Sequence, residues 1–434
     1  MAKTYDTYKD SGIAWIGEIP GEWEVCRLKD TSSLYTGNSI KDEKKDYYED
    51  KNDARPYIAT KDIDATYMTA NYENGLYIKH ADNIFRIAPP FSSLMCIEGG
   101  SAGRKKTFID REVSFVNKLC CFAPLKGVLG KYIYYFLCSP NFEDIFNSKI
   151  TGLIGGVNIP TLKNIECLLP PLSVQQSISS FLDTKCGEID SLISIQEEMI
   201  SELLAYKQSV ITEAVTKGLD KKAKMKNSGV EWIGDIPEEW VKDKIFRVFS
   251  VIGSGTTPKA TDDRNFEGDI NWIQSGDING GKMFECKNKI SENVLNQYST
   301  LKIYKAPFII VAMYGASVGN ISISNIDGCV NQACCVMSNS NQCFNYLFYA
   351  IKAAKDYLIY RAEGGGQPNI SQDKLKNLWL PLPPLPVQQA IATYLDEKTS
   401  QIDSLIALKQ SKIESLKEYK KSIIYEYVTG KKRV

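Results

Sequence analysis

Apolar side chains recur at helical spacing in two long stretches of the chain, and this pattern predicts two long helices. Within each stretch the apolar positions are three or four residues apart, or separated by sums of these steps, which keeps them on one face of a helix. In the first stretch they are Ile178, Leu182, Ile189, Leu192, Met199, Leu203, Tyr206 and Val210. The pattern returns 213 residues later at Ile391, Leu395, Ile402, Leu405, Leu416, Tyr419 and Ile423. Such a seam predicts that the two helices pair as an antiparallel coiled coil, which Gln196, Lys409 and Lys412 weaken in the middle.

Proline clusters mark the points where these helices begin. Proline lacks a backbone N–H and clashes with the preceding turn, so it is excluded from helix interiors and central strands. The clusters are Pro170 with Pro171, and Pro381, Pro383, Pro384 and Pro386. The pattern therefore predicts helices over residues 173–217 and 386–430, with the polar segment 218–226 as a linker.

The remaining segments have a mixed pattern that is typical of α+β domains. Short β-type runs such as 308–314 alternate with glycine turns and with helical stretches such as 343–360. We therefore predict two globular α+β domains, over residues 1–172 and 227–385, each followed by one of the long helices.

The chain also contains an internal repeat, which explains why the patterns occur twice. The segment SGIAWIGEIPGEW at 11–23 returns as SGVEWIGDIPEEW at 228–240. Similarly, LPPLSVQQSISSFLD at 169–183 returns as LPPLPVQQAIATYLD at 382–396. Similarity is weaker between these anchors, as in YIATKDI at 57–63 beside WIQSGDI at 272–278. Two copies that share a framework and differ in the middle are expected to meet two different ligands.

Composition limits the function only partly. The 434 residues suggest two or three domains, and a hydrophobic fraction of 43% is enough to form cores. The 52 basic and 52 acidic residues cancel, so net charge does not by itself indicate a nucleic-acid partner. No apolar stretch is long enough for a membrane span and the start has no secretory signal, so we expect a cytoplasmic protein without a membrane partner.

The candidate chemical motifs favour no catalytic role. The glycine-rich run 99–107 lacks the spacing of a phosphate-binding loop, and its counterpart 314–320 has no lysine. No methyltransferase catalytic motif is present, and the single histidine, His80, has no nucleophile partner in the sequence. The twelve cysteines include no C-x-x-C pair, so we expect reduced, mostly buried thiols. We therefore expect no metal and no cofactor in this chain.

The repeated anchors resemble those of one protein family. Two unlike globular halves, each opened by WIG-x-IP-x-EW and closed by a PPL-x-VQQ boundary and a helix with IDSLI, resemble Type I restriction-modification specificity subunits. The resemblance covers roughly residues 8–430 and implies a non-catalytic, sequence-specific DNA-recognition subunit. It implies a bipartite, asymmetric double-stranded DNA target, with one half-site for each target-recognition domain. It also implies two modification (methyltransferase) subunits and motor-nuclease restriction subunits as partners, which would bring S-adenosylmethionine, ATP and Mg.

The resemblance further implies that loops of each domain enter the major groove, where side-chain amides and guanidinium groups distinguish base pairs. In the first copy the candidate DNA-binding residues are Thr60, Lys61, Arg104, Lys105, Lys106 and Asn158. In the second copy they are Gln274, Ser275, Ser317, Asn320, Gln367 and Asn369. The alternative for each of them is a solvated loop residue without a ligand.

Two other functions stay open from the sequence. One is a piece of a self-contained restriction-methylation enzyme, which methyl transfer by the purified chain alone would reveal. The other is a coiled-coil scaffold that does not touch nucleic acid, in which case methylation by its complex would be absent or independent of sequence. The target bases and the spacer between half-sites cannot be derived from these residues.

Overall fold

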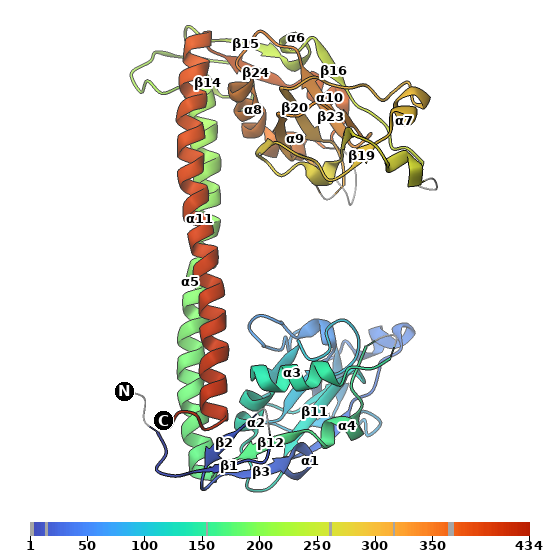
Figure 1. Ribbon diagram of the computed structural model, residues 1–434, viewed down its shortest axis with the longest axis vertical. Helices are drawn as coiled ribbons and strands as arrows, with labels where there is room; N and C mark the ends of the chain where they lie inside the picture. The colour runs from blue at the N-terminus through green and yellow to red at the C-terminus, as the bar shows by residue number, and fades with distance from the viewer. Residues whose placement is uncertain (1–3, 14–15, 153–154, 260–262, 316, 363–368) are drawn as a thin grey trace. The chain divides into compact units, whose positions relative to one another are not determined.

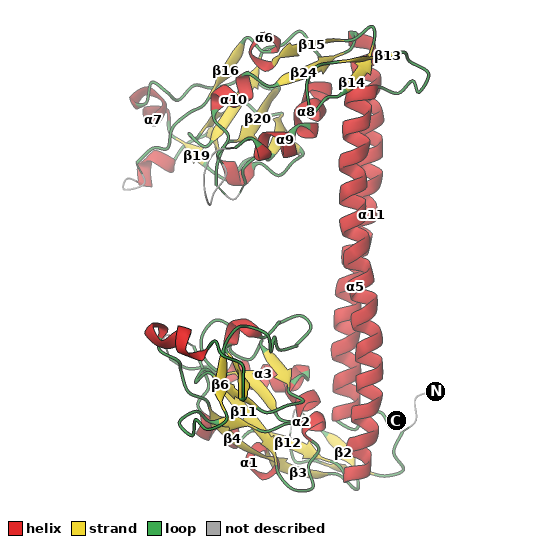
Figure 2. Cartoon of the chain, turned by 180° about the vertical axis from the view of Figure 1, so that it is seen from behind, coloured by secondary structure: helices red, strands yellow, loops and turns green. Residues whose placement is uncertain are grey.

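A computed structural model describes residues 4–13, 16–152, 155–259, 263–315, 317–362 and 369–434 of the chain. The chain forms two compact units, of which the first combines Met1–Glu198 with Lys409–Val434. The second unit is Met199–Leu408. Each unit therefore contains one globular part together with helical segments from both halves of the chain (Figure 1, Figure 2).

The two long helices are α5 (Leu172–Lys217) and α11 (Leu385–Val428), close to the predicted bounds. Within the first unit the rings of Phe181 and Tyr427 lie 4.4 Å apart, and Lys420 binds Asp190 at 2.7 Å. Residue numbers rise along α5 while they fall along α11, so this pairing is antiparallel. The predicted pairing is therefore confirmed.

The composition of the seam differs from the prediction at several positions. Leu192, Met199, Tyr206, Leu405 and Tyr419 are exposed and do not lie in the seam. The buried position beside Leu192 is Ile193, and the buried position beside Leu405 is Ile406. The sequence pattern combined two apolar lines that run along adjacent faces of each helix, and packing buries only one of them.

The first unit has two sheets and two smaller strand pairs. One sheet has the order β6-β5-β10-β7 and the other β4-β11-β8-β9. Their strands are β6 (Tyr77–Lys79), β5 (Ala54–Ile58), β10 (Val113–Phe115), β7 (Ile87–Ala88), β4 (Ser32–Thr36), β11 (Leu119–Pro124), β8 (Ser93–Cys96) and β9 (Lys106–Phe108). The pairs are β1 (Tyr8–Asp10) with β2 (Glu18–Pro20) and β3 (Glu24–Arg27) with β12 (Glu166–Leu169). The helices are α1 (Leu28–Thr31), α2 (Gly130–Leu137), α3 (Pro140–Ser148) and α4 (Ile159–Lys163).

The second unit repeats this plan. Its sheets have the orders β16-β23-β20-β21-β18 and β19-β17-β22. Their strands are β16 (Val251–Gly253), β23 (Cys334–Ser338), β20 (Phe308–Ala312), β21 (Ile321–Ser324), β18 (Lys282–Met283), β19 (Lys289–Ile290), β17 (Ile270–Ile273) and β22 (Cys329–Val330). The pairs are β13 (Met225–Asn227) with β14 (Asp235–Pro237) and β15 (Val241–Lys244) with β24 (Trp379–Leu382). The helices are α6 (Ile245–Val248), α7 (Glu292–Gln297), α8 (Phe344–Ala353), α9 (Lys355–Tyr360) and α10 (Gln372–Lys376).

These elements confirm the predicted strand within 308–314 and the predicted helical stretch 343–360. All twelve cysteines are free and most are buried, as expected. The segment predicted as a linker ends in β13, so its last residues belong to the second globular part. Among the described residues, no helix combines the length and apolar character that a membrane span requires.

A buried tyrosine joins each globular part to the far end of the other repeat's helix. The Tyr132 hydroxyl on α2 lies 3.0 Å from the Leu168 carbonyl and 3.2 Å from the Val428 carbonyl at the end of α11. The Tyr346 hydroxyl on α8 lies 2.8 Å from the Pro381 carbonyl and 3.3 Å from that of Val215 near the end of α5. These contacts fix the helix pair against the globular part within each unit.

Candidate nucleic-acid interface

Three loops that the sequence singled out come together in the first unit. The Lys105 amine donates to the Thr60 carbonyl at 2.9 Å. The Gly99 N–H donates to the Gly155 carbonyl at 2.7 Å, and Glu98 pairs with Gly156 in a β-bridge. We call residues 59–62, 98–106 and 151–158, as far as they are described, the first loop cluster.

The chain itself fixes the shape of this cluster. The Asp62 carboxylate accepts hydrogen bonds from the Ala59 N–H at 2.8 Å and from the Asn74 side chain at 2.7 Å. Gly103 has a φ of +72°, and a Cβ there would lie 2.8 Å from the Phe146 ring. Glycine is therefore required at this turn, because other residues avoid positive φ and would meet the ring.

The glycine turn is not a phosphate-binding loop. The N–H groups of Ala102, Gly103 and Arg104 donate to carbonyls of Gly99, Cys96 and Ser101 at 2.9, 2.8 and 3.1 Å. A phosphate cradle requires backbone N–H groups that point at the ligand. These three N–H groups are therefore not available to a phosphate.

The second unit builds the same turn with different side chains. The Gly319 N–H donates to the Ala312 carbonyl at 2.8 Å, matching the bond from Gly103 to Cys96. The Gln274 N–H donates to Asp277 at 2.9 Å, as that of Ala59 does to Asp62. Likewise, the bond from Ile370 to Met313 at 2.7 Å matches the bond from Val157 to Ile97 at 3.0 Å. We call residues 274–277, 314–320 and 369–371, as far as they are described, the second loop cluster.

The predicted residues of the first cluster differ in their availability. Lys61 and Arg104 are exposed, whereas Thr60 and Lys105 are half-buried. Asn158 is exposed, but its side chain accepts from the Thr161 N–H at 2.9 Å and caps α4. Lys106 is fully buried, with its amine 2.7 Å from both the Leu137 carbonyl and the Glu143 carboxylate. This placement gives Lys106 a structural role and leaves it unavailable to DNA.

The predicted residues of the second cluster also differ. Gln274, Ser275 and Ser317 are half-buried, and Asn369 is exposed. The Asn320 amide donates to the Ile278 carbonyl at 3.3 Å and accepts from the Lys355 amine at 2.9 Å, so its polar atoms are engaged. Gln367 lies outside the described residues.

Sequence reasoning missed several polar side chains beside these loops. Glu98, Asn117 and Thr36 line a groove of about 580 Å³ that also includes Asn158. The structural match of the two turns pairs Glu98 with Tyr314 and Arg104 with Asn320. The sequence signal was present, because the aligned glycines 99 and 315, and 103 and 319, place these residues opposite each other.

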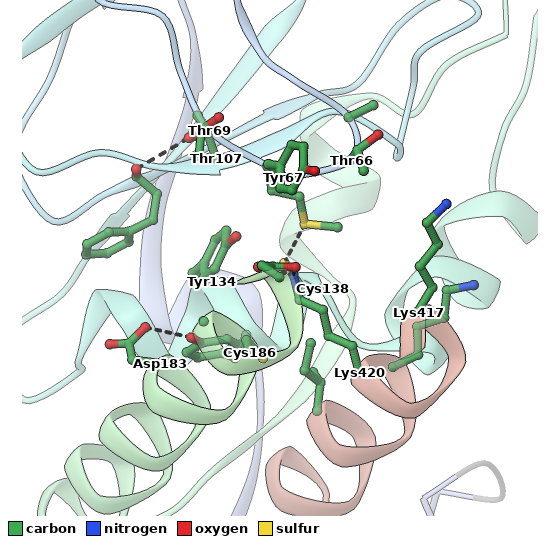
Figure 3. Close-up of a pocket in the computed structure, with 18 of the residues that line it drawn as sticks. Thr66, Tyr67, Thr69, Thr107, Tyr134, Cys138, Asp183, Cys186, Lys417 and Lys420 are labelled. Atoms are coloured by element: carbon green, nitrogen blue, oxygen red, sulfur yellow. Dashed lines mark hydrogen bonds and ion pairs between the residues drawn. The ribbon is translucent and has the colours of Figure 1, made fainter. Parts of the chain in front are cut away.

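A larger cavity of about 820 Å³ lies in the first unit between the loop at residues 65–70, α2 and the helix pair. Figure 3 shows Tyr67, Tyr134 and Cys138 at this cavity, together with Asp183 and Lys420. Asp183 accepts from the Tyr135 hydroxyl at 2.6 Å and pairs with Lys131 at 3.0 Å. Asp190 is held by Lys420.

The groups in this cavity are not arranged for catalysis. Burial raises the pKa of the Cys186 thiol to about 12 and also raises the pKa of Cys138, so neither thiol is an activated nucleophile. Both aspartates are paired. In the second unit the bond from Tyr349 to Asp396 at 2.8 Å and the pair of Lys207 with Asp403 at 2.6 Å repeat the arrangement. These contacts are best explained as joints between each globular part and its helices.

The same joint in the second unit contains the half-buried amine of Lys352. The Lys352 amine donates to the Gly280 carbonyl at 2.7 Å. Burial is the main cause that lowers the pKa of Lys352 to about 8, and the neighbouring Lys207 lowers it further. In this joint Lys352 replaces Cys138 of the first copy.

The long helices expose a set of apolar residues that is repeated between the units. Leu172, Leu192, Ile195 and Tyr419 are exposed in the first unit. Leu385, Leu405, Leu408 and Tyr206 are exposed in the second, and each pair of counterparts is 213 residues apart. We call these eight residues the repeated apolar set. The same exposed apolar positions therefore occur in both copies.

Comparisons with known proteins agree over nearly the whole chain. A family model described as Type I restriction modification DNA specificity domain matches residues 20–204 and 237–418. The putative type I restriction enzyme MjaX specificity subunit of Methanocaldococcus jannaschii is 26% identical over 430 residues, covering 96% of each chain. The EcoBI specificity subunit of Escherichia coli is 22% identical, covering 91% of this chain and 83% of the relative.

The fold also matches a solved structure. A chain from a study of complex assembly and conformational transition of the type I R-M system aligns with a TM-score of 0.71 at 16% identity. The alignment covers 94% of this chain and 98% of the other. At 16% identity this match shows that the fold is shared and nothing further.

Proposed function

Because the chain belongs to the Type I restriction modification DNA specificity family, we propose that its two loop clusters bind the two halves of a split DNA target. It is a non-catalytic DNA-recognition subunit, and partner subunits carry the enzyme activities. In the proposed division, domains 1–172 and 227–385 read one half-site each. The helices 173–217 and 386–430 join them, and residues 218–226 are the linker.

The observation that carries this proposal is the pair of matched loop clusters. Several of their backbone N–H groups make matching hydrogen bonds, whereas their side chains differ, as in Lys61 and Gly276 or Arg104 and Asn320. A constant frame with variable side chains suits two readers of different sequences, because base edges are distinguished by side-chain donors and acceptors. Lys61, Arg104, Gln274, Ser275, Ser317 and Asn369 are the predicted residues that remain available.

The repeated apolar set supports two copies of a partner. Two equivalent surfaces, one in each unit, fit two modification subunits, which would supply S-adenosylmethionine. Motor-nuclease restriction subunits, which use ATP and Mg, would then join the complex. This complex would act in the cytoplasm, where bacterial and archaeal chromosomes lie.

The balanced charge fits a division of labour between these subunits. With 52 basic and 52 acidic residues, this chain has no net excess to attract phosphates. Phosphate contacts supply most of the affinity for DNA, and base contacts supply specificity. We therefore expect the isolated subunit to bind DNA weakly and with a shallow salt dependence.

The test is the methylated motif produced by the complex of this chain with its modification subunit. We expect a bipartite, asymmetric motif whose half-sites are centred about 34–36 Å apart, one helical turn, as in dimeric readers. A continuous or palindromic motif would contradict the proposal. So would methylation that is independent of sequence, which is the result that a scaffold gives.

A further inference from the structure

Glu98 is an acidic residue at the start of the glycine turn in the first loop cluster. Its backbone pairs with Gly156, and its exposed side chain lines the groove with Asn117 and Asn158. Within the described part of the chain, no lysine or arginine forms an ion pair with its carboxylate. The acceptor oxygens of Glu98 are therefore available to a ligand.

A free carboxylate is unfavourable on a DNA-binding surface unless it contacts a donor. Phosphates repel it, and an ionised carboxylate only accepts hydrogen bonds. In the major groove, the donors that bases offer are the exocyclic amino groups of cytosine and adenine. Guanine and thymine present acceptor oxygens there, which repel a carboxylate and cannot donate a hydrogen bond to it. A glutamate at this place therefore discriminates between bases instead of adding affinity.

The second unit provides an internal comparison. Its turn carries Tyr314 where the first carries Glu98, and the amide of Asn320 is engaged within the protein where Arg104 is exposed. The described backbone hydrogen bonds of Gly103 and Gly319 match, so the two turns differ mainly in their side chains. Any effect of the carboxylate should therefore appear in one half-site only.

We propose that Glu98 is a specificity-determining residue that accepts a hydrogen bond from an exocyclic amino group, of cytosine or adenine, in the half-site read by the first domain. The inference rests on the proposed function, because it assumes that the first loop cluster faces the major groove. Arg104 at the other end of the turn supplies donors for the neighbouring acceptor positions or for phosphate.

The experiment determines the methylated motif for complexes of the full chain with its modification subunit, carrying Glu98→Ala, Glu98→Gln or the control Glu166→Gln. Glu166 is exposed on β12, outside the loop cluster, and its substitution makes the same charge change. The Glu98→Ala complex should accept other bases at one position of one half-site. Discrimination there should fall about tenfold to hundredfold, the range for losing one base contact. All other positions should stay unchanged.

The Glu98→Gln complex distinguishes the two amino groups. Glutamine binds adenine through two hydrogen bonds. If the wild-type base is cytosine, the variant should relax this position or change it to adenine. If the wild-type base is adenine, the variant should keep it. Removing the charge should also leave binding to a non-cognate duplex equal or stronger, which separates a reading role from a loss of folding.

The outcomes separate this inference from the proposed function. If the wild type and the Glu166→Gln control give no bipartite motif, the proposed function fails. If both give the motif and the Glu98→Ala motif is identical at every position, the inference about Glu98 fails alone. A folded and assembled Glu98→Ala complex that no longer methylates at all also overturns it, because a discriminating acceptor sets specificity and not the bulk of affinity.

Discussion

Two basic residues of one loop, Arg104 and Lys106, have different roles because burial separates them. Arg104 is exposed on the glycine turn, whereas Lys106 begins β9 and is fully buried against Glu143 and the end of α2. The sequence could not distinguish them, because lysine is almost never fully buried unless it is paired. Its partner, Glu143, is 37 residues away, so only the tertiary structure reveals the pair.

Substituting Lys106 should therefore lower the stability of the chain, and substituting Arg104 should lower its DNA binding. Lys106→Met leaves Glu143 and the Leu137 carbonyl without their donor, and we expect the unfolding free energy to fall by about 1–3 kcal/mol. Arg104→Ala should leave stability within about 0.5 kcal/mol and should weaken DNA binding by the complex. Urea denaturation of the chain and DNA titration of the complex measure these quantities. A stable Lys106→Met chain with impaired DNA binding would show that Lys106 contributes to DNA binding after all.

Lys352 should make stability depend on pH. Its pKa of about 8 in the folded state lies below the ordinary value of 10.5, so between these values the unfolded chain binds more protons. Stability then rises with pH. The free-energy cost of a charged Lys352 amine in the folded state is fully present below pH 8 and disappears as pH approaches 10.5. From pH 7.5 to 9.5 the gain should be about 1–2 kcal/mol.

Lys352→Met isolates this effect, because the other titrating groups are common to both proteins. The groups that face the amine are Lys207, Asp403 and Lys355. As pH rises, the unfolding free energy of the wild type should increase relative to that of the variant, because methionine does not titrate. Parallel stability curves over this range would show that the amine stays charged in the folded state.

At the scale of elements, the sequence predicted where the long helices begin and most, but not all, of the apolar residues that they bury. Proline sets a helix start locally, so the starts of α5 and α11 follow from a few residues. Burial depends on which face the antiparallel partner covers, and several apolar positions in the heptad pattern turned out to be exposed. Their repetition in both copies is what distinguishes them from random surface residues.

Polar substitutions in the repeated apolar set should each remove one partner subunit. We expect Leu192→Lys with Ile195→Lys to reduce the complex from two modification subunits to one, because the second unit keeps its own surface. Leu405→Lys with Leu408→Lys should give the same stoichiometry. Native mass spectrometry of the complexes counts the subunits, and circular dichroism should show that helix content is kept. Two bound partners in both double variants would place the interface elsewhere.

At the scale of the whole molecule, most of the correct predictions from the sequence came from the internal repeat. The repeated anchors indicated two globular parts and two helices, and both are present in the structure. The loop clusters were found only in part, because Glu98 is an acidic residue on a surface where amide, hydroxyl and basic side chains were sought. Asn158 and Asn320 matched the expected side-chain chemistry, but the fold uses their amides for its own hydrogen bonds.

Modularity follows from the repeat. If each globular part reads its half-site alone, exchanging residues 25–168 for the first domain of another family member should alter one half-site and leave the other unchanged. The exchange keeps β1, β2 and the start of α5 but replaces Tyr132 and Tyr135, so the incoming domain has to supply its own contacts to the helices. Methylome sequencing of a host with the hybrid subunit gives the result. Simultaneous change of both half-sites would show that the domains do not read independently.

The length of the helices should set the spacer between the half-sites, because α5 and α11 each contribute residues to both units. Inserting four residues between Glu198 and Met199, with a matched insertion between Leu408 and Lys409, adds about 6 Å to each helix at 1.5 Å per residue. One base pair advances the duplex by about 3.4 Å, so the spacer should lengthen by one or two base pairs. Because no reading loop is touched, the recognised bases should stay the same. The added turn also rotates one reader relative to the other, so we expect lower activity, and the methylated motif is the measurement. An active double-insertion variant with the original spacer would show that these helices do not measure the distance.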